Sequence, residues 1–508
     1  MFPQLDAMTF GSFLVVLVLV ALSGVIASRW HHRADGGLEE WGLGGRQFGT
    51  LVTWFLVGGD FYTAYTIIAV PALVFATGAA GFFALPYTII VYPFVFLTMP
   101  RLWSVCRIHN LVTPADFVRA RYGSHWLASA VALTGIFALM PYIALQLTGM
   151  EVVLAQMGMT GKTPLMQALP VAIAFAGVAA FTFGAGLRAP ALIAFAKDVM
   201  IYIVVIAAVC LLPHHFGGYH AIFHQAATRF ADHHNAGIIL RSTEYSAYAT
   251  LALGSALAAF MYPHTITSVL ASGGANVIRR NAVLLPAYTF LLGLVALLGI
   301  VGAGAGLHLH SSKDVVPALI LIAFPRWFVG FAFAAITVAA LVPAAIMSIA
   351  AANLFTRNLY REYLHRNASG SEQANVAKYA SVAVNAGALL FVIFLPVSYA
   401  INLQLLGGVL ILQTFPAIVF GLWRRLFHHN ALLLGWVAGI AYSVALIMHL
   451  KFQTSVYPVL LGSQTIPIYV GILALMLNLL VASLATVSMD WFGMPRLPDA
   501  ITDEDFLD

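Results

Sequence analysis

Apolar stretches of about 20 residues, the length that crosses the hydrocarbon core of a bilayer, recur along the whole chain. Of its 508 residues, 61% are hydrophobic and 8% are charged, and the mean hydropathy is +0.92. A soluble protein carries about 25% charged residues, so this chain cannot cover its surface in water. We therefore expect an all-α polytopic membrane protein, with no soluble segment long enough to form a second domain.

The hydropathy pattern predicts thirteen transmembrane helices in one transporter domain over residues 1–508. The first stretch lacks the positively charged start of a signal peptide, so we interpret it as a retained helix. The predicted spans are residues 9–28, 50–73, 80–100, 125–157, 166–187, 189–212, 246–272, 281–305, 328–355, 378–396, 402–422, 431–450 and 466–488.

Arginine and lysine gather in one alternate set of the predicted loops, which includes Arg101, Arg119, Arg357 and Arg361. Such loops face the cytoplasm in membrane proteins, which places the N-terminus outside and the C-terminus inside. These loops account for the net charge of +5, so the sequence gives no reason to expect a nucleic-acid partner.

Two predicted spans are interrupted in the middle by glycine, proline and polar residues. They are FLVGGDFYTAYTIIAVP, residues 55–71, and ATLALGSALAAFMYPHTITSVLAS, residues 249–272. They lie five spans apart, which indicates two five-helix repeats (50–212 and 246–422) between one extra N-terminal helix (9–28) and two C-terminal helices (431–488). Interrupted segments at matching positions of two halves point to the binding site of a transporter. The alternative is that both are ordinary kinked helices packed by small residues.

Four stretches, the first of which overlaps the interrupted span 55–71, carry a resemblance to a known family: WGLGGRQFGTLVTWFLVGGDFYTAY, LWSVCRIHNLVTPADFVRARYGS, PYIALQLTGM and VPAAIMSIAAANLFTRNLYREY. Together they resemble the sodium:solute symporter family, and within it the bacterial monocarboxylate permeases for acids such as lactate and pyruvate. The likeness runs from about residue 38 to residue 480. It implies the LeuT-type fold of two inverted five-helix repeats, which agrees with the helix pattern above.

The resemblance also implies a sodium site between the first broken helix and the eighth core helix. Its carbonyl ligands correspond to Gly58, Phe61 and Ala345, and its hydroxyl ligands to Ser348 and Ile349. Because an isoleucine side chain offers no oxygen to a hard cation, this chain departs from the family pattern.

A second departure is the triplet Ala196-Lys197-Asp198, where the family has Trp-Thr-Asp. The aspartate is kept, and a lysine precedes it. Ionisable residues inside a membrane span are costly and mark a functional site by default. Lys197 could replace the sodium ion, which would give proton coupling or no coupling. Alternatively, it extends to water at the membrane surface or simply neutralises Asp198. We favour H+ over Na+ as the coupling cation and leave both open.

A monocarboxylate needs compensation for its negative charge, and the exposed N–H groups of a broken helix provide it. Around the first break, Gly59, Tyr62, Thr63 and Tyr65 are candidate substrate-binding residues. Asp60 suits an anion poorly, so we assign it to coupling or gating, or to hydrogen bonding of the unwound backbone.

Further polar residues on other predicted spans are candidates for the substrate pathway. They are Tyr142, Gln146, Tyr262, His264, Gln404 and Gln413. Taken alone, each of them is more often explained by an interhelical hydrogen bond than by contact with a ligand.

The sequence therefore predicts a secondary active importer of small organic acids in the bacterial cytoplasmic membrane. No HExxH, GxSxG or GxxxxGK[ST] motif is present, so we expect neither an enzyme nor an ATP-driven transporter. We expect no cofactor, and no metal ion other than a coupling sodium. The alternative is a sodium-coupled symporter of an amino acid or a sugar, and the oligomeric state stays open.

Overall fold

The computed structural model describes residues 6–29, 37–159, 164–231, 236–394 and 400–506. The last two residues of the predicted span 378–396 lie outside these ranges. Among the described residues, nine helices are long and apolar enough to cross a membrane, or ten if the bent pair Ile401–Thr414 and Pro416–Trp423 is one span. The structure therefore confirms a multi-pass helical protein, whereas the predicted count of thirteen stays a prediction.

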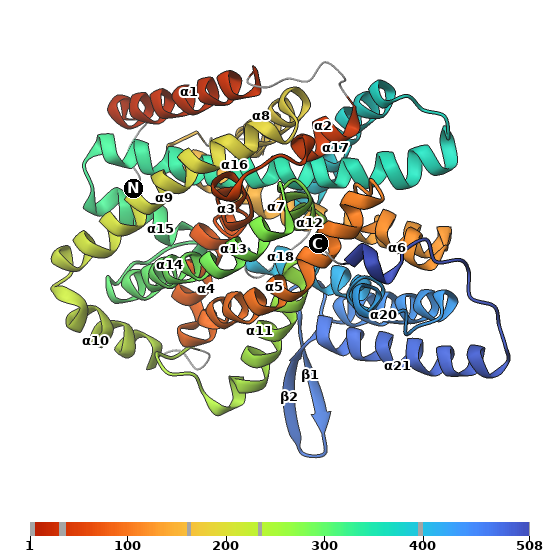
Figure 1. Cartoon of the computed structure of the whole chain (residues 1–508). Coiled ribbons are helices and arrows are strands. Elements are labelled where there is room, and N and C mark those ends of the chain that lie inside the picture. Colours follow the sequence, from red (N-terminus) through yellow and green to blue (C-terminus); the bar gives the residue numbers. More distant parts are fainter. Residues whose placement is uncertain (1–5, 30–36, 160–163, 232–235, 395–399, 507–508) are drawn as a thin grey trace.

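The helices follow one another in the chain with short connections (Figure 1). The α-helices of the first half are α1 (Ala7–Arg29), α2 (Leu38–Leu43), α3 (Thr50–Gly59), α4 (Val70–Thr77), α5 (Ala84–Ile108), α6 (Pro114–Tyr122), α7 (His125–Gln156), α8 (Pro164–Ala185), α9 (Arg188–His215) and α10 (Gly218–Ala231). Those of the second half are α11 (Tyr245–Ala259), α12 (Pro263–Leu270), α13 (Ala275–Leu284), α14 (Pro286–Gly304), α15 (Val315–Ala323), α16 (Arg326–Leu354), α17 (Gly370–Phe394), α18 (Ile401–Ile411), α19 (Gly421–Trp423), α20 (His429–His449) and α21 (Val470–Trp491).

Shorter 3-10 and π-helical segments join or extend these helices. They are η1 (Gly44–Arg46), η2 (Tyr65–Ala69), η3 (Ala79–Phe83), η4 (Ser242–Glu244), η5 (Ser312–Asp314), η6 (Phe355–Leu364), η7 (Leu412–Thr414), η8 (Pro416–Phe420) and η9 (Asp503–Phe506). Three of them, η2, η6 and η8, are π-helical.

The all-α prediction did not include a β-hairpin that joins α20 to α21. Its strands β1 (Val456–Leu461) and β2 (Gln464–Tyr469) pair antiparallel, and Gly462 in the turn has a φ of +63°. A two-residue turn of this kind requires positive φ, which glycine adopts without strain. The hairpin projects from the helical body (Figure 1) and is anchored at its base by the Tyr469 hydroxyl, which donates to the Leu405 carbonyl at 2.7 Å.

Both predicted interruptions are present. The first lies between α3 and α4, where the chain leaves the α-helix after Gly59 and continues through the π-helical turn η2. The second lies between α11 and α12, where three residues separate Ala259 from Pro263. Proline suits the first position of a helix because its missing N–H would have no intrahelical partner there. Gly254 and Ser255, which helped to mark this span, lie inside α11 rather than at the break.

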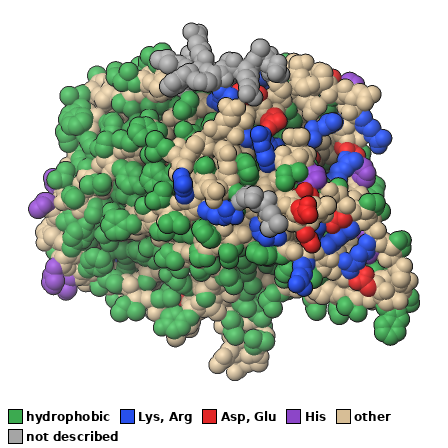
Figure 2. Space-filling view, in the orientation of Figure 1, with side chains coloured by type: hydrophobic (Ala, Val, Ile, Leu, Met, Phe, Trp, Pro, Cys, Tyr) green, Lys and Arg blue, Asp and Glu red, His purple; other side chains and the backbone are tan. Residues whose placement is uncertain are grey.

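Charged side chains gather over one end of the molecule, around α6 and the C-terminal segment, while hydrophobic side chains cover most of the face beside it (Figure 2). This arginine-rich end contains the loops that the charge pattern assigns to the cytoplasm. At the core of the helical body, α16 packs along α7, α1 and α9, and α9 in turn packs against α3 and α14. The first break is thereby enclosed by α9 and α14.

Candidate functional site

Lys197 on α9 reaches into the first helix break. Its side chain is fully buried, and Nζ donates hydrogen bonds to the carbonyl oxygens of Gly59 at 2.6 Å and Tyr62 at 2.9 Å. The ammonium therefore binds backbone carbonyls at the point where the chain leaves the helix. Its complete burial rules out the alternative in which this lysine extends to water.

Asp198 faces the same site. One carboxylate oxygen lies 3.1 Å from the Lys197 ammonium, and the other accepts a hydrogen bond of 2.6 Å from the Tyr288 hydroxyl on α14. Gly59 lies against this pair, because a Cβ at that position would be 3.0 Å from Nζ and 3.5 Å from the Asp198 carboxylate. The ammonium thus has three oxygen neighbours, two carbonyls and one carboxylate, which is a ligand set that also suits a hard monovalent cation.

Asp60 joins the two broken helices. It is 5% exposed, and its Oδ2 accepts a hydrogen bond of 3.0 Å from the Ser268 hydroxyl on α12. No hydrogen bond to its other oxygen is found in the described part of the chain. The first break therefore holds two buried carboxylates, Asp60 and Asp198, against the single ammonium of Lys197.

The backbone carbonyls predicted as sodium ligands in the first break have partners within the protein. The carbonyl of Gly58 accepts from the N–H of Phe61 at 2.9 Å, and the carbonyl of Phe61 accepts from the Thr66 hydroxyl. The lysine instead uses the carbonyls of the residues that follow each of them, Gly59 and Tyr62.

The predicted ligands on α16 are all fully buried: Ala345, Ser348 and Ile349. Ser348 Oγ lies 2.7 Å from the carbonyl of Ala344 and 2.6 Å from Oδ1 of Asn385 on α17. This hydroxyl therefore ties α16 to α17, and Ile349 beside it has no oxygen in its side chain.

Several predicted substrate residues satisfy the unwound backbone of the first break. The Gln146 side-chain oxygen accepts from the N–H of Ala64 at 3.0 Å, and the Thr63 hydroxyl accepts from the N–H of Tyr65 at 3.0 Å. The Tyr62 hydroxyl donates to the Tyr288 carbonyl at 3.2 Å. These contacts hold open a break whose N–H and C=O groups have lost their helical partners, since such groups must be satisfied inside a membrane.

At the second break, three rings form one cluster, one from α7, one from the break itself and one from α12. The ring centroids of Tyr142, Tyr262 and His264 lie 5.3–5.5 Å from one another. The Tyr262 hydroxyl donates to the carbonyl of Gln404 on α18 at 2.8 Å. Gln413 is separate from this cluster, because its amide contacts the carbonyl of Val409 and the side chain of Asn478 on α21.

Three polar residues of these sites were not among the sequence candidates: Tyr288, Ser268 and Asn385. Each shares its helix with at least one other buried polar side chain. No local motif marks them, and their partners lie 37 to 208 residues away along the chain. In the sequence, they are indicated only by the general rule that a polar group inside a membrane span needs a partner.

The model of the sodium:solute symporter family matches residues 41–439 of the chain. A monocarboxylate transport permease protein of Rhizobium johnstonii is 53% identical over 92% of the chain and 94% of its own length. An uncharacterized symporter of Bacillus subtilis, YodF, is 36% identical over 84% of the chain and 85% of its own length.

Among solved structures, a substrate-bound, outward-open Na+-coupled sialic acid symporter has the same fold. It matches 96% of the chain and 98% of its own length with a TM-score of 0.75, at 14% sequence identity. The family model and both relatives describe transporters rather than enzymes. The chain therefore belongs to the sodium:solute symporter family.

Proposed function

We propose that this symporter imports small monocarboxylates by cation symport, that the coupling ion is a proton rather than sodium, and that Lys197 stands where a coupling cation would otherwise bind. The observation that carries the proposal is the contact of the Lys197 ammonium with the carbonyls of Gly59 and Tyr62. The relative from Rhizobium, a monocarboxylate transport permease protein, supports the substrate class.

The chemistry of the break supports a proton. A lysine ammonium carries the same unit charge as sodium and, like it, binds to carbonyl and carboxylate oxygens. Unlike sodium, the ammonium cannot leave, so its charge changes through gain or loss of a proton. Lys197 in its charged form holds the break together, and its deprotonation would free the carbonyls of Gly59 and Tyr62 and leave Asp198 without a counter-charge.

Charge balance at the break supports the same coupling ion. With Lys197 charged and both Asp60 and Asp198 ionised, the buried site carries one net negative charge. Burying an uncompensated charge is expensive. A single added proton neutralises the site. Because Lys197 is already protonated in this state, the added proton would bind Asp198 or Asp60 and would be coupled in this way to the state of the two broken helices.

For an anionic substrate, the second break offers two kinds of group: the N–H groups at the start of a helix and a tyrosine hydroxyl. The N-terminus of α12 begins at Pro263 beside the Tyr142, Tyr262 and His264 cluster, and the positive end of a helix favours a carboxylate. The Tyr142 hydroxyl would supply a hydrogen bond. We place the monocarboxylate here, between the two breaks. We place the protein in a bacterial cytoplasmic membrane, with its N-terminus outside and its C-terminus in the cytoplasm.

The substrate is tested by counterflow with the purified protein in liposomes, which requires no assumption about the coupling ion. Liposomes loaded with unlabelled lactate should take up labelled lactate and pyruvate, and an excess of alanine or glucose should not compete. Exchange of alanine or glucose without exchange of lactate would refute the monocarboxylate assignment.

The second candidate is a Na+-coupled symporter of another small solute, an amino acid or a sugar. The shared fold with a Na+-coupled sialic acid symporter favours it. Lys197 argues against the sodium part, because a fixed ammonium near the break repels a second cation. The same counterflow experiment with alanine and glucose as labelled solutes separates this candidate from the first.

A further inference from the structure

A cavity of about 810 Å³ opens at the arginine-rich end of the molecule, away from the broken helices. It lies between α6, the first turns of α7, η6 and the C-terminal residues Pro498–Ala500. Its size is that of a pocket for a small ligand. None of the residues assigned to the ion or substrate site lines it.

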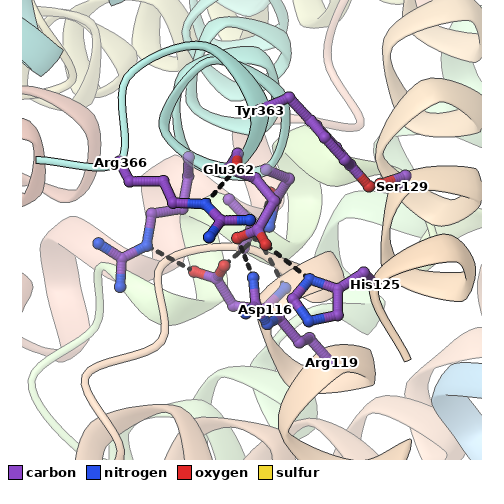
Figure 3. Close-up of polar contacts among 10 residues, drawn as sticks. Asp116, Arg119, His125, Ser129, Glu362, Tyr363 and Arg366 are labelled. Carbon is purple, nitrogen blue, oxygen red and sulfur yellow. Dashed lines mark hydrogen bonds and ion pairs between the residues drawn. The ribbon is translucent and has the colours of Figure 1, made fainter. Parts of the chain in front are cut away.

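Each carboxylate of this cavity is already paired with a guanidinium. Asp116 Oδ2 lies 3.3 Å from the Nε of Arg357, and Glu362 accepts hydrogen bonds from Arg119 and from His125 (Figure 3). These pairs join α6 and the start of α7 to η6.

The third carboxylate, Asp499 of the C-terminal segment, lies 2.8 Å from Arg121. Two further arginines line the cavity, Arg361 and Arg366. Arg366 donates through Nε to the backbone carbonyl of Glu362 at 3.3 Å. Among the described residues, neither of these two arginines has an ion pair with a carboxylate. The cavity therefore presents surplus positive charge to its open side, and this favours an anion.

Large apolar side chains flank the same residues and face outward. Trp126, which follows His125, is 73% exposed, and Leu364, two residues after Glu362, is 72% exposed. The hydroxyl of Tyr363 is fixed by a hydrogen bond of 2.7 Å with Ser129 (Figure 3). Tryptophan and tyrosine concentrate at the boundary between lipid and water. Exposed side chains of this kind beside the lining residues are what the boundary between lipid and water favours.

We propose that this cavity binds the phosphate group of an anionic phospholipid headgroup, with Arg361 and Arg366 as its ligands. Guanidinium groups donate pairs of hydrogen bonds to phosphate oxygens, and basic pockets at helix ends bind anionic headgroups. A soluble phosphate would use the same arginines, but the exposed Trp126 and Leu364, next in the chain to or two residues from residues that line the cavity, favour an acyl chain beside the headgroup.

The test uses the full-length protein in detergent and measures its unfolding temperature as phosphatidylglycerol is added. Phosphatidylcholine and inorganic phosphate at equal ionic strength are the comparison ligands. The double variant Arg361→Gln/Arg366→Gln removes the surplus charge and leaves the carboxylate pairs in place. Arg107→Gln, at an exposed arginine on the same end outside the cavity, is the matched control.

We expect phosphatidylglycerol to raise the unfolding temperature of the wild type and of Arg107→Gln, and phosphatidylcholine to have little effect. In the double variant the apparent affinity should fall about tenfold or more, since hydrogen bonds to charged groups contribute that much. An equal shift in the double variant and in the control would overturn the proposal, as would no shift in the wild type. An equal, arginine-dependent shift with inorganic phosphate would overturn the lipid assignment in favour of a soluble phosphate.

Discussion

Replacing Lys197 by methionine should destabilise the protein more than removal of a typical membrane hydrogen bond. Methionine keeps an apolar chain of similar length, so the change removes mainly the ammonium. The carbonyls of Gly59 and Tyr62 then lose their donor, and Asp198 keeps only the Tyr288 hydroxyl as a partner. Removing one member of a buried ion pair costs about 3–5 kcal/mol, whereas an interhelical hydrogen bond in a membrane averages about 0.6 kcal/mol.

The measurement is the free energy of unfolding in detergent at pH 7, with Lys378→Met on α17 as the matched control. We expect a loss of about 3–5 kcal/mol for Lys197→Met and about 0.5 kcal/mol or less for the control. The double variant Lys197→Met/Asp198→Asn should regain much of the loss, because it removes both charges of the pair and returns the break to the net charge that it has in the wild type. If Lys197→Met is as stable as the control, the ammonium does not hold the break together, and the assignment fails.

Three further changes test other parts of the structure. Ser348→Ala removes a hydroxyl 2.6 Å from Asn385, so we expect a loss of stability of about 1 kcal/mol and unchanged ion dependence of uptake. Gly58→Ala would place a Cβ 2.2 Å from the Tyr288 ring, so uptake should fall and unfolding should become easier by about 1–3 kcal/mol. His109 donates to Asp505 and lowers the pKa of that carboxyl below its ordinary value of about 3.9. A lowered carboxyl pKa contributes stability that disappears as pH falls, so the C-terminal segment should become more sensitive to a protease from pH 5 to pH 3. In His109→Ala, this protease sensitivity should depend less on pH.

The two helix breaks could be predicted because their cause is local. Gly58 and Gly59 weaken the helix in one span, and Pro263 starts a new helix in the other. Lys197 and Asp198 were also recognisable, since charged residues inside an apolar span need a partner. Consecutive positions on a helix point in different directions, so the sequence could not show that both side chains reach the same break.

The partners of these residues depend on the packing of helices far apart in the chain. Tyr288 on α14 contacts Asp198, and Ser268 on α12 contacts Asp60. Nothing near either residue in the sequence distinguishes it from other buried hydroxyls. Residue type alone could not show which helix Gln413 contacts, and its amide contacts Asn478 on α21 rather than the cluster at the second break. Hydropathy does not reveal the hairpin, because β1 lies in a predicted loop and β2 overlaps the start of the predicted span 466–488.

The ion that drives uptake tests the central claim most directly. Labelled lactate uptake would be measured in proteoliposomes with an inward proton gradient in sodium-free buffer, and separately with an inward sodium gradient at equal pH. We predict accumulation with the proton gradient alone, and its loss in Lys197→Ala but not in Lys378→Met. A strict requirement for sodium in the wild type would contradict the account, because it would mean that a sodium ion binds despite the ammonium in the break.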